Sequence, residues 1–147
     1  MKQYIDATEL AGREFFKDFH QKGKFTMLNL LKFNAIANYS ELNSIKPLQN
    51  ITGKEAYDVY MEHILPLLKK AGSRILFYGS SSNFLIGPDS EKWDAVLLVE
   101  HESVENFIRF SQNKDYLKYS GHRKAGLSDS RLLPIAQGST VKWGVNI

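Results

Sequence analysis

The sequence predicts an α+β fold in which helices cover one face of a four-stranded antiparallel sheet. Segments with strand character and amphipathic helices follow each other in the order β-α-β-β-α-β after an additional N-terminal helix. The strands are also apolar on both of their faces. At 147 residues, the chain fits one domain with a full core. We divide it into a helical extension at 1–23, a ferredoxin-like core at 24–135 and a tail at 136–147.

Composition excludes several classes of protein. The chain is 43% hydrophobic and 24% charged, as globular proteins are, and it has no cysteine for disulfides, thiolate metal sites or a thiol nucleophile. No apolar run reaches 18 residues and the first residues lack an apolar signal core, so we expect a cytoplasmic protein without a membrane partner. Its 19 basic and 16 acidic residues are interspersed, which argues against a nucleic-acid partner.

The first half of the chain shows one extra helix, one strand and one long helix. Asp6 and Glu9 have the spacing of a capping box, and Gly23 is a stop signal, so we expect a helix at 7–22. Residues 24–33 predict a strand. Thr52 and Glu55 form a second capping box. The apolar period that follows predicts a helix ending near Gly72, with a kink at its proline, residue 66.

The second half predicts three strands and two helical stretches. One strand covers 74–78, bends through the Gly-Ser-rich residues 79–82 and resumes at 84–86. The clearest strand covers 93–100. Ser103 is expected to cap a helix, and Asn113 to start another that continues to about residue 124. A short strand is expected at 130–135, and residues 141–145 of the tail can add an edge strand.

The apolar character of both strand faces predicts that the sheet is covered on both sides. Leu28 and Leu30 oppose Met27 and Leu31, and residues 95–99 are apolar throughout. An uncovered face of this kind exceeds the apolar patch that a monomer normally exposes. A second copy of the chain is the commonest cover. The N-terminal helix is the alternative.

Four segments in order resemble the domain-of-unknown-function 1330 family of the dimeric α/β-barrel superfamily. They are residues 27–33, residues 53–57 with Tyr60, residues 85–88 leading into Trp93 and Asp94, and residues 122–132. The resemblance covers about 25–135. It implies two ferredoxin-like halves stacked sheet on sheet, each with a cavity between sheet and helices. It implies no reaction, because the superfamily includes monooxygenases, isomerases, dehydratases and haem-binding proteins.

Polar residues within otherwise apolar elements are the candidate site residues. Asn29 and Lys32 stand on the first strand, where they either line a pocket or bond to neighbouring backbone. His122 and Arg123 end a helix. They either act as a general acid or base with an anion-binding group, or favour the helix C-terminus with positive charge.

Four further residues are candidates for ligand binding. Asp94 either orients a histidine or arginine, or ends a turn beside a packed Trp93. Arg131 either joins His122 and Arg123 or pairs with Asp129 or Asp94. Tyr60 has core-facing helical spacing, so its ring packs in the core in one interpretation and its hydroxyl reaches the pocket in the other.

Asn29, Trp93 and His101 invite comparison with the Asn, Trp and His set of haem-degrading monooxygenases, but the Trp-to-His spacing differs. There is no His-x-x-x-His pair and no phosphate-binding glycine loop, so we expect neither metal nor cofactor. Three hypotheses remain. The protein is a cofactor-independent enzyme acting on a hydrophobic oxygenated small molecule, a non-catalytic ligand-binding dimer, or a purely structural dimer.

Overall fold

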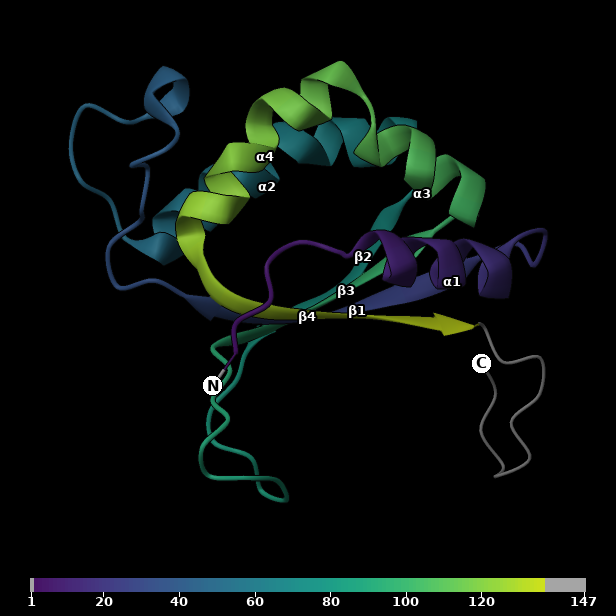
Figure 1. Cartoon of the computed structure of the whole chain (residues 1–147), viewed down its shortest axis with the longest axis horizontal. Coiled ribbons are helices and arrows are strands. Elements are labelled where there is room, and N and C mark those ends of the chain that lie inside the picture. Colours follow the sequence, from purple (N-terminus) through teal and green to yellow (C-terminus); the bar gives the residue numbers. More distant parts are fainter. Residues whose placement is uncertain (1, 137–147) are drawn as a thin grey trace.

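A computed structural model describes residues 2–136, and in it helices lie on one face of a four-stranded antiparallel sheet (Figure 1). The strand order is β2-β3-β1-β4. The elements are α1 (Glu9–Phe19), β1 (Phe25–Phe33), α2 (Gly53–Lys70), β2 (Arg74–Ser80), β3 (Ala95–His101), α3 (Val104–Ser111), α4 (Lys114–Gly126) and β4 (Leu127–Ala136). A 3-10 turn, Asn43–Ile45, lies in the β1–α2 connection. The predicted α+β, ferredoxin-like fold with an additional N-terminal helix is confirmed.

Capping side chains fix where most of the helices begin. The Thr52 hydroxyl accepts from the Glu55 N–H at 3.0 Å, and the Thr52 N–H donates to Glu55 Oε1 at 2.9 Å. Ser103 and Asn113 cap α3 and α4 as predicted. The prediction that Asp6 caps the first helix is wrong. Thr8 accepts from the Ala11 N–H instead, while the Asp6 carboxylate lies 3.6 Å from Lys124 Nζ.

The second predicted strand differs from the observed one at its C-terminal end. Gly79 and Ser80 still pair with β3, and the irregularity lies between Ile75 and Phe77. Residues 84–86 form no strand, so that prediction is wrong. They belong to the β2–β3 loop, where no neighbouring strand pairs with them and Leu85 is 99% exposed. The edge strand expected at 141–145 lies outside the described residues.

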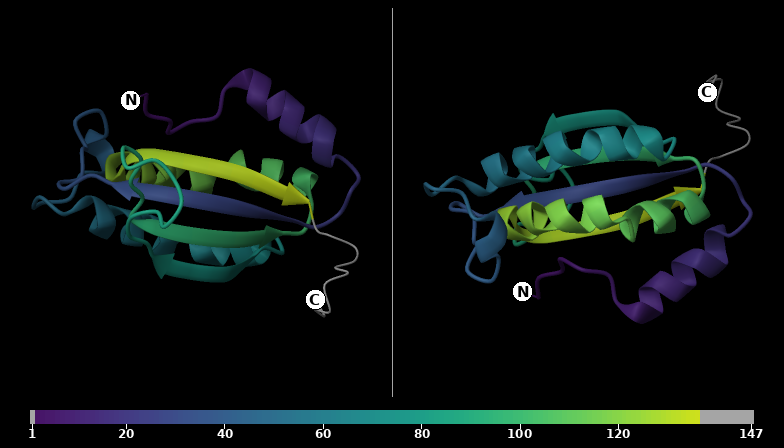
Figure 2. Two further views of the ribbon diagram at one scale, coloured as in Figure 1. Left: turned by 90° about the horizontal axis from the view of Figure 1, so that it is seen from below. Right: turned by 90° about the horizontal axis from the view of Figure 1, so that it is seen from above.

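The core lies between the sheet and the helices. Phe25, Met27 and Leu31 of β1 are buried there, and Ala95, Leu97 and Val99 of β3 share that face. The helix α1 lies alongside the β4 edge (Figure 2). Its Phe15 and Phe19 pack on Phe25, Met27 and Val104, on the helix-covered side of the sheet. The alternative in which this helix covers the other face is therefore wrong.

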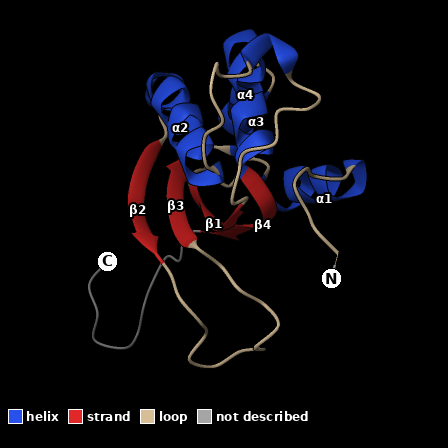
Figure 3. Ribbon diagram, turned by 90° about the vertical axis from the view of Figure 1, so that its left-hand side faces the viewer, coloured by secondary structure: helices blue, strands red, loops and turns tan. Residues whose placement is uncertain are grey.

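The face of the sheet away from the helices is apolar and bare among the described residues. Strand pairing places Leu28 of β1 beside Leu98 of β3 and Leu133 of β4, and Leu98 beside Phe77 of β2. Paired residues share a face, so one apolar row crosses all four strands. The β2–β3 loop projects past this open face (Figure 3). None of the helices within residues 2–136 has the length and apolarity to span a membrane.

Candidate functional site

A partly open cavity of about 510 Å³ lies between the sheet and the helices. β1 and β3 form its floor, α2 and the α3–α4 pair form its roof, and the N-terminal segment with α1 closes one side. Most of its lining is aliphatic or aromatic, including Phe15, Met27, Ile64, Leu97, Val99 and Phe107. This size and character are typical of small-molecule sites.

One end of the cavity carries a cation and several hydroxyl groups. Arg123 of α4 is half-buried there, donating from Nη1 to the Ile5 carbonyl at 2.8 Å and from Nη2 to Ser130 Oγ at 3.4 Å. Tyr60 and Tyr116 share a hydrogen bond at 3.1 Å between their hydroxyls. Tyr57 is 2% exposed and lines the same cavity.

The hydroxyls of Tyr57 and Tyr60 remain protonated at neutral pH. Burial raises the pKa of Tyr57, although the nearby Arg123 opposes the rise. Burial, with Tyr116 and Tyr57 adding to it, raises the pKa of Tyr60 well above its ordinary value. Protonated phenols donate hydrogen bonds. This end of the cavity is therefore equipped to bind an oxygen acceptor.

Asn29 lies on the floor of the cavity with its amide turned toward backbone. Its Nδ2 donates to the carbonyls of Met27 at 3.3 Å and Leu97 at 3.2 Å. Both amide hydrogens are thereby used, and the side-chain oxygen remains as an acceptor. No buried side-chain nitrogen or oxygen in residues 2–136 lacks a partner. The Asn29 oxygen, with no hydrogen bond among those residues, is therefore accessible from the cavity.

His101 lies at the opposite end of the cavity, where β3 ends. Its Nδ1 is 2.8 Å from Ser73 Oγ, and its ring packs on Phe25 and Phe107. The residue is 3% exposed, and this burial lowers the pKa of His101 to about 4. The imidazole is therefore neutral at pH 7. Sequence reasoning considered His101 only beside Trp93, although strand alternation from Val99 already places it on the cavity face.

His122, the other candidate histidine, does not line the cavity. Its Nδ1 is 2.7 Å from the Tyr39 hydroxyl, and its ring lies 6.1 Å from the ring of His63. Burial, and then the neighbouring His63, lower the pKa of His122. Consecutive helical residues point about 100° apart. The structure thus separates His122, which supports the β1–α2 connection, from Arg123, which faces the cavity.

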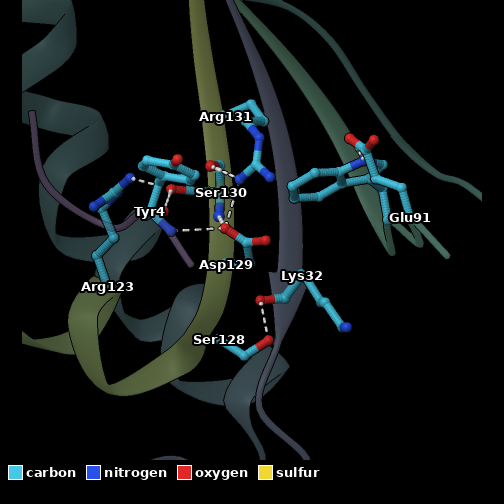
Figure 4. A network of polar contacts seen from close by, with 9 residues as sticks. Tyr4, Lys32, Glu91, Arg123, Ser128, Asp129, Ser130 and Arg131 are labelled. Atoms are coloured by element: carbon cyan, nitrogen blue, oxygen red, sulfur yellow. Dashed lines mark hydrogen bonds and ion pairs between the residues drawn. The ribbon is translucent and has the colours of Figure 1, made fainter. Parts of the chain in front are cut away.

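Arg131 and Trp93 do not line the cavity. Arg131 belongs to a network that holds the N-terminal segment on β4 and that reaches Arg123 through Ser130 (Figure 4). The Arg131 guanidinium lies 4.8 Å from the ring centroids of both Tyr4 and Trp93, and its Nη1 donates to Asp129 Oδ1 at 2.6 Å. Asp129 Oδ1 also accepts from the Tyr4 N–H at 2.8 Å, and the Tyr4 carbonyl accepts from Ser130 Oγ at 2.6 Å. Burial by itself raises the pKa of Asp129, but the hydrogen bonds that its carboxylate accepts outweigh this effect, so the pKa is lowered.

The two remaining candidates also lie away from the cavity. Asp94 accepts from the Phe33 N–H at 2.8 Å, which joins the start of β3 to the end of β1. Lys32 is exposed on β1. Of the sequence-derived candidates, the structure brings together Asn29, Tyr60 and Arg123 around the cavity. Trp93 contacts Arg131 and does not line the cavity with Asn29 and His101. The set of Asn29, Trp93 and His101 is therefore not assembled in one site.

The site contains no group of metal ligands. Within residues 2–136, no three histidine, aspartate or glutamate side chains lie close enough together to hold an ion. The chemistry that the described site offers is hydrogen bonding and charge neutralisation at one end and apolar contact along the rest.

Comparison with known proteins gives the chain's relatives. It is similar to the crystal structure of RPA0582, a protein of unknown function from Rhodopseudomonas palustris. The identity is 29% and the TM-score 0.82 over 95% of this chain and all of that one. The structure of methylated RPA0582 is 30% identical with a TM-score of 0.82, covering 99% of this chain and 100% of that one.

A more distant likeness is to a dimeric protein of unknown function with a ferredoxin-like fold from Bacteroides fragilis. It is 14% identical, with a TM-score of 0.46 over 81% of this chain and 99% of that one. No functionally curated protein matches the sequence. The model of a family described as a domain of unknown function, DUF1330, matches residues 44–135. Because this range spans more than half of the sequence, the chain belongs to the DUF1330 family.

Proposed function

We propose that this protein is a homodimeric small-molecule-binding protein whose cavity takes a largely apolar ligand. The observation that carries the proposal is the cavity of about 510 Å³, which is lined by apolar side chains and has its cation at one end. A closely packed core leaves few voids larger than a water molecule. A space of this size between sheet and helices therefore favours a binding function over a purely structural one.

The arrangement of the polar groups favours binding over catalysis. Asn29 pairs with Leu97, and His101 pairs with Phe25, so Asn29 and His101 are four residues apart along the strand direction. At a rise of about 3.3 Å per residue this is about 13 Å. An acid–base pair must reach the same reacting atoms within hydrogen-bond distance. The cofactor-independent enzyme built on His122 loses support for a different reason, because His122 faces Tyr39 and does not line the cavity.

The apolar open face of the sheet supports a second copy of the chain as its cover. Phe77 is 55% exposed and Leu133 is 57% exposed in the single chain, at the two ends of the row that crosses the sheet. Leu85 and Ile86 of the β2–β3 loop are 99% and 92% exposed, and this loop projects past the open face (Figure 3). Pairing two identical faces buries the row in both copies.

The cavity is tested with the uncharged fluorescent dye N-phenyl-1-naphthylamine and a substitution that fills the space. Val99 faces the cavity from β3. Val99→Phe is expected to weaken dye binding at least about tenfold, because the larger ring takes up the volume the dye needs.

Leu48→Phe is the control, because it adds the same ring at a fully exposed residue that lines neither the cavity nor the open face. It is expected to retain dye binding. The proposal is overturned if the wild-type protein does not bind the dye, or if Val99→Phe binds it as well as Leu48→Phe does.

A further inference from the structure

The cavity contains a guanidinium without a counterion among the described residues. The hydrogen bonds of Arg123 go to two uncharged acceptors, the Ile5 carbonyl and the Ser130 hydroxyl. Arg131, which is also half-buried, has the Asp129 carboxylate at 2.6 Å. A guanidinium has five N–H donors, so three of those on Arg123 remain. Half-buried charge without an opposite charge is costly, which favours an anion at this position.

The other charged residue of the lining does not supply that anion. Asp6 also lines the cavity, but its carboxylate lies 3.6 Å from the Nζ of Lys124, the residue that follows Arg123 in α4. One guanidinium with neighbouring phenols matches a singly charged oxyanion. The Arg123 fork suits a carboxylate, which accepts two parallel N–H bonds. A phosphate ester with two charges would leave one charge unmatched.

The cavity is long as well as apolar. Positions along β1 mark the two ends of the cavity. Arg123 donates a hydrogen bond to Ser130, which is paired with Leu31 of β1, and His101 at the other end is paired with Phe25 of β1. Six residues of strand separate these levels, or about 20 Å between the Cα positions. Aliphatic and aromatic side chains such as Met27, Val99 and Phe107 lie between them.

We infer that the ligand is an elongated apolar monocarboxylate of the fatty-acid type. Its carboxylate lies on Arg123 beside the Tyr57 hydroxyl, and its chain extends along β1 toward Phe107 and His101. The inference rests on the proposed binding function and names the ligand class of the same cavity. In this inference Arg123 supplies the only positive charge that binds the carboxylate, and the apolar floor of the cavity binds the hydrocarbon chain.

The test is displacement of N-phenyl-1-naphthylamine by dodecanoate and by dodecan-1-ol, which differ in the charged group. The wild-type protein is expected to bind dodecanoate at least about tenfold more tightly than dodecan-1-ol, because hydrogen bonds to charged groups contribute that much or more. Octanoate is expected to bind more weakly than dodecanoate, since its chain leaves the His101 end empty.

Arg123→Gln is expected to remove the preference for dodecanoate while dye and dodecan-1-ol still bind. Lys118→Gln removes the same charge from an exposed position on α4 and is expected to keep the preference. Arg123→Lys, which retains the charge without the fork, is expected to lie between wild type and Arg123→Gln. It serves as the second variant if Arg123→Gln does not fold.

The outcomes separate the two proposals. If the dye binds and Val99→Phe abolishes binding, but dodecanoate and dodecan-1-ol bind alike, the carboxylate inference is overturned and the binding function stands. If Lys118→Gln reduces the preference as much as Arg123→Gln does, the effect belongs to surface charge and the inference is also overturned. Failure of the dye to bind overturns the binding function itself.

Discussion

Neighbouring residues in the sequence serve different parts of the molecule, as His122 and Arg123 show. Sequence reasoning grouped them because both are basic and adjacent, but the helical period turns one toward Tyr39 and the other toward the cavity. Strand alternation is the better guide here. It places Asn29 and His101 on one face, because alternate residues of a strand, or residues paired across strands, point the same way. His101 was therefore within reach of the sequence, whereas its pairing with Ser73 was not.

Acidification is expected to destabilise the protein through His101. Burial lowers the pKa of His101 to about 4 in the folded state, while an unfolded chain binds the proton near pH 6.5. Between these values the unfolded state holds more protons, so the free energy of unfolding falls as the pH drops from about 6.5 to about 4. The full loss is about 3 kcal/mol. Urea unfolding across this pH range measures it.

A variant that lacks only the His101 imidazole and an exposed control isolate this contribution. His101→Gln is expected to flatten the pH dependence over this range, whereas His63→Gln, at an exposed position on α2, leaves most of it in place. The pKa of His122 is shifted in the same direction and adds a slope that His101→Gln retains in full, whereas His63→Gln loses only the part that His63 contributes to that shift. Equal slopes in wild type and His101→Gln would contradict the assignment.

The starts of three helices were predictable from short-range chemistry, whereas the start of α1 and the pairing of the strands were not. The side chains of Thr52, Ser103 and Asn113 accept hydrogen bonds from N–H groups two or three residues away, so the local sequence is enough to predict their roles. Residues 84–86 have β-forming side chains, but a strand also needs a partner, and β3 is already paired on both sides by β1 and β2. Whether a segment finds a partner strand depends on the arrangement of the whole sheet, which the local sequence does not reveal.

The crossing of α2 and α4 depends on two glycines in direct contact. The Gly53 N–H donates to the Asn34 carbonyl at 2.9 Å, and the Asn34 N–H donates to the Gly126 carbonyl at 2.8 Å. A Cβ added to Gly126 would come 2.6 Å from the Gly53 carbonyl oxygen. Gly126→Ala is therefore expected to lower the free energy of unfolding by about 1–3 kcal/mol or more, measured by urea denaturation.

Gly12 of α1 provides the opposite case for the same substitution. A Cβ there meets no atom within 4 Å, and alanine is favoured over glycine inside a helix by about 0.5–1 kcal/mol. Gly12→Ala is thus expected to leave stability unchanged or to raise it slightly. If both alanine variants lose stability equally, close backbone contact is not what requires glycine at residue 126.

At the scale of the whole molecule, one face of the sheet lines the cavity and the other is the face that we propose binds a second copy. The sequence predicted that both faces are apolar. It did not reveal which face the N-terminal helix covers, because that depends on Phe15 and Phe19 packing against Phe25 and Val104. With this helix on the cavity side, the open face relies on the second copy that we propose.

Leu98→Arg is expected to convert the dimer into a monomer. Leu98 lies between Phe77 and Leu28 in the row that crosses the open face, and a charge there would be buried without a partner in a sheet-to-sheet contact. Native mass spectrometry of purified variants reports the subunit count directly.

Leu48→Arg makes the same change at a fully exposed leucine and is expected to leave the dimer intact. Leu133→Arg, at an exposed position of the same row, provides a milder test in case Leu98→Arg does not fold. A wild-type monomer at all concentrations, or variants of both row leucines that remain dimeric, would contradict the proposed interface.

The hydrogen bonds that hold the N-terminal segment also set the order in which the protein can be completed during synthesis. The Tyr4 N–H bonds Asp129, 125 residues later in the chain, and the Tyr4 carbonyl bonds Ser130. Tyr4 therefore finds these partners only after residues 129 and 130 have emerged from the ribosome. Until then, the side wall of the cavity that this segment forms is missing. Under the binding function that we propose, a bulky ligand can enter from that side before the segment closes it.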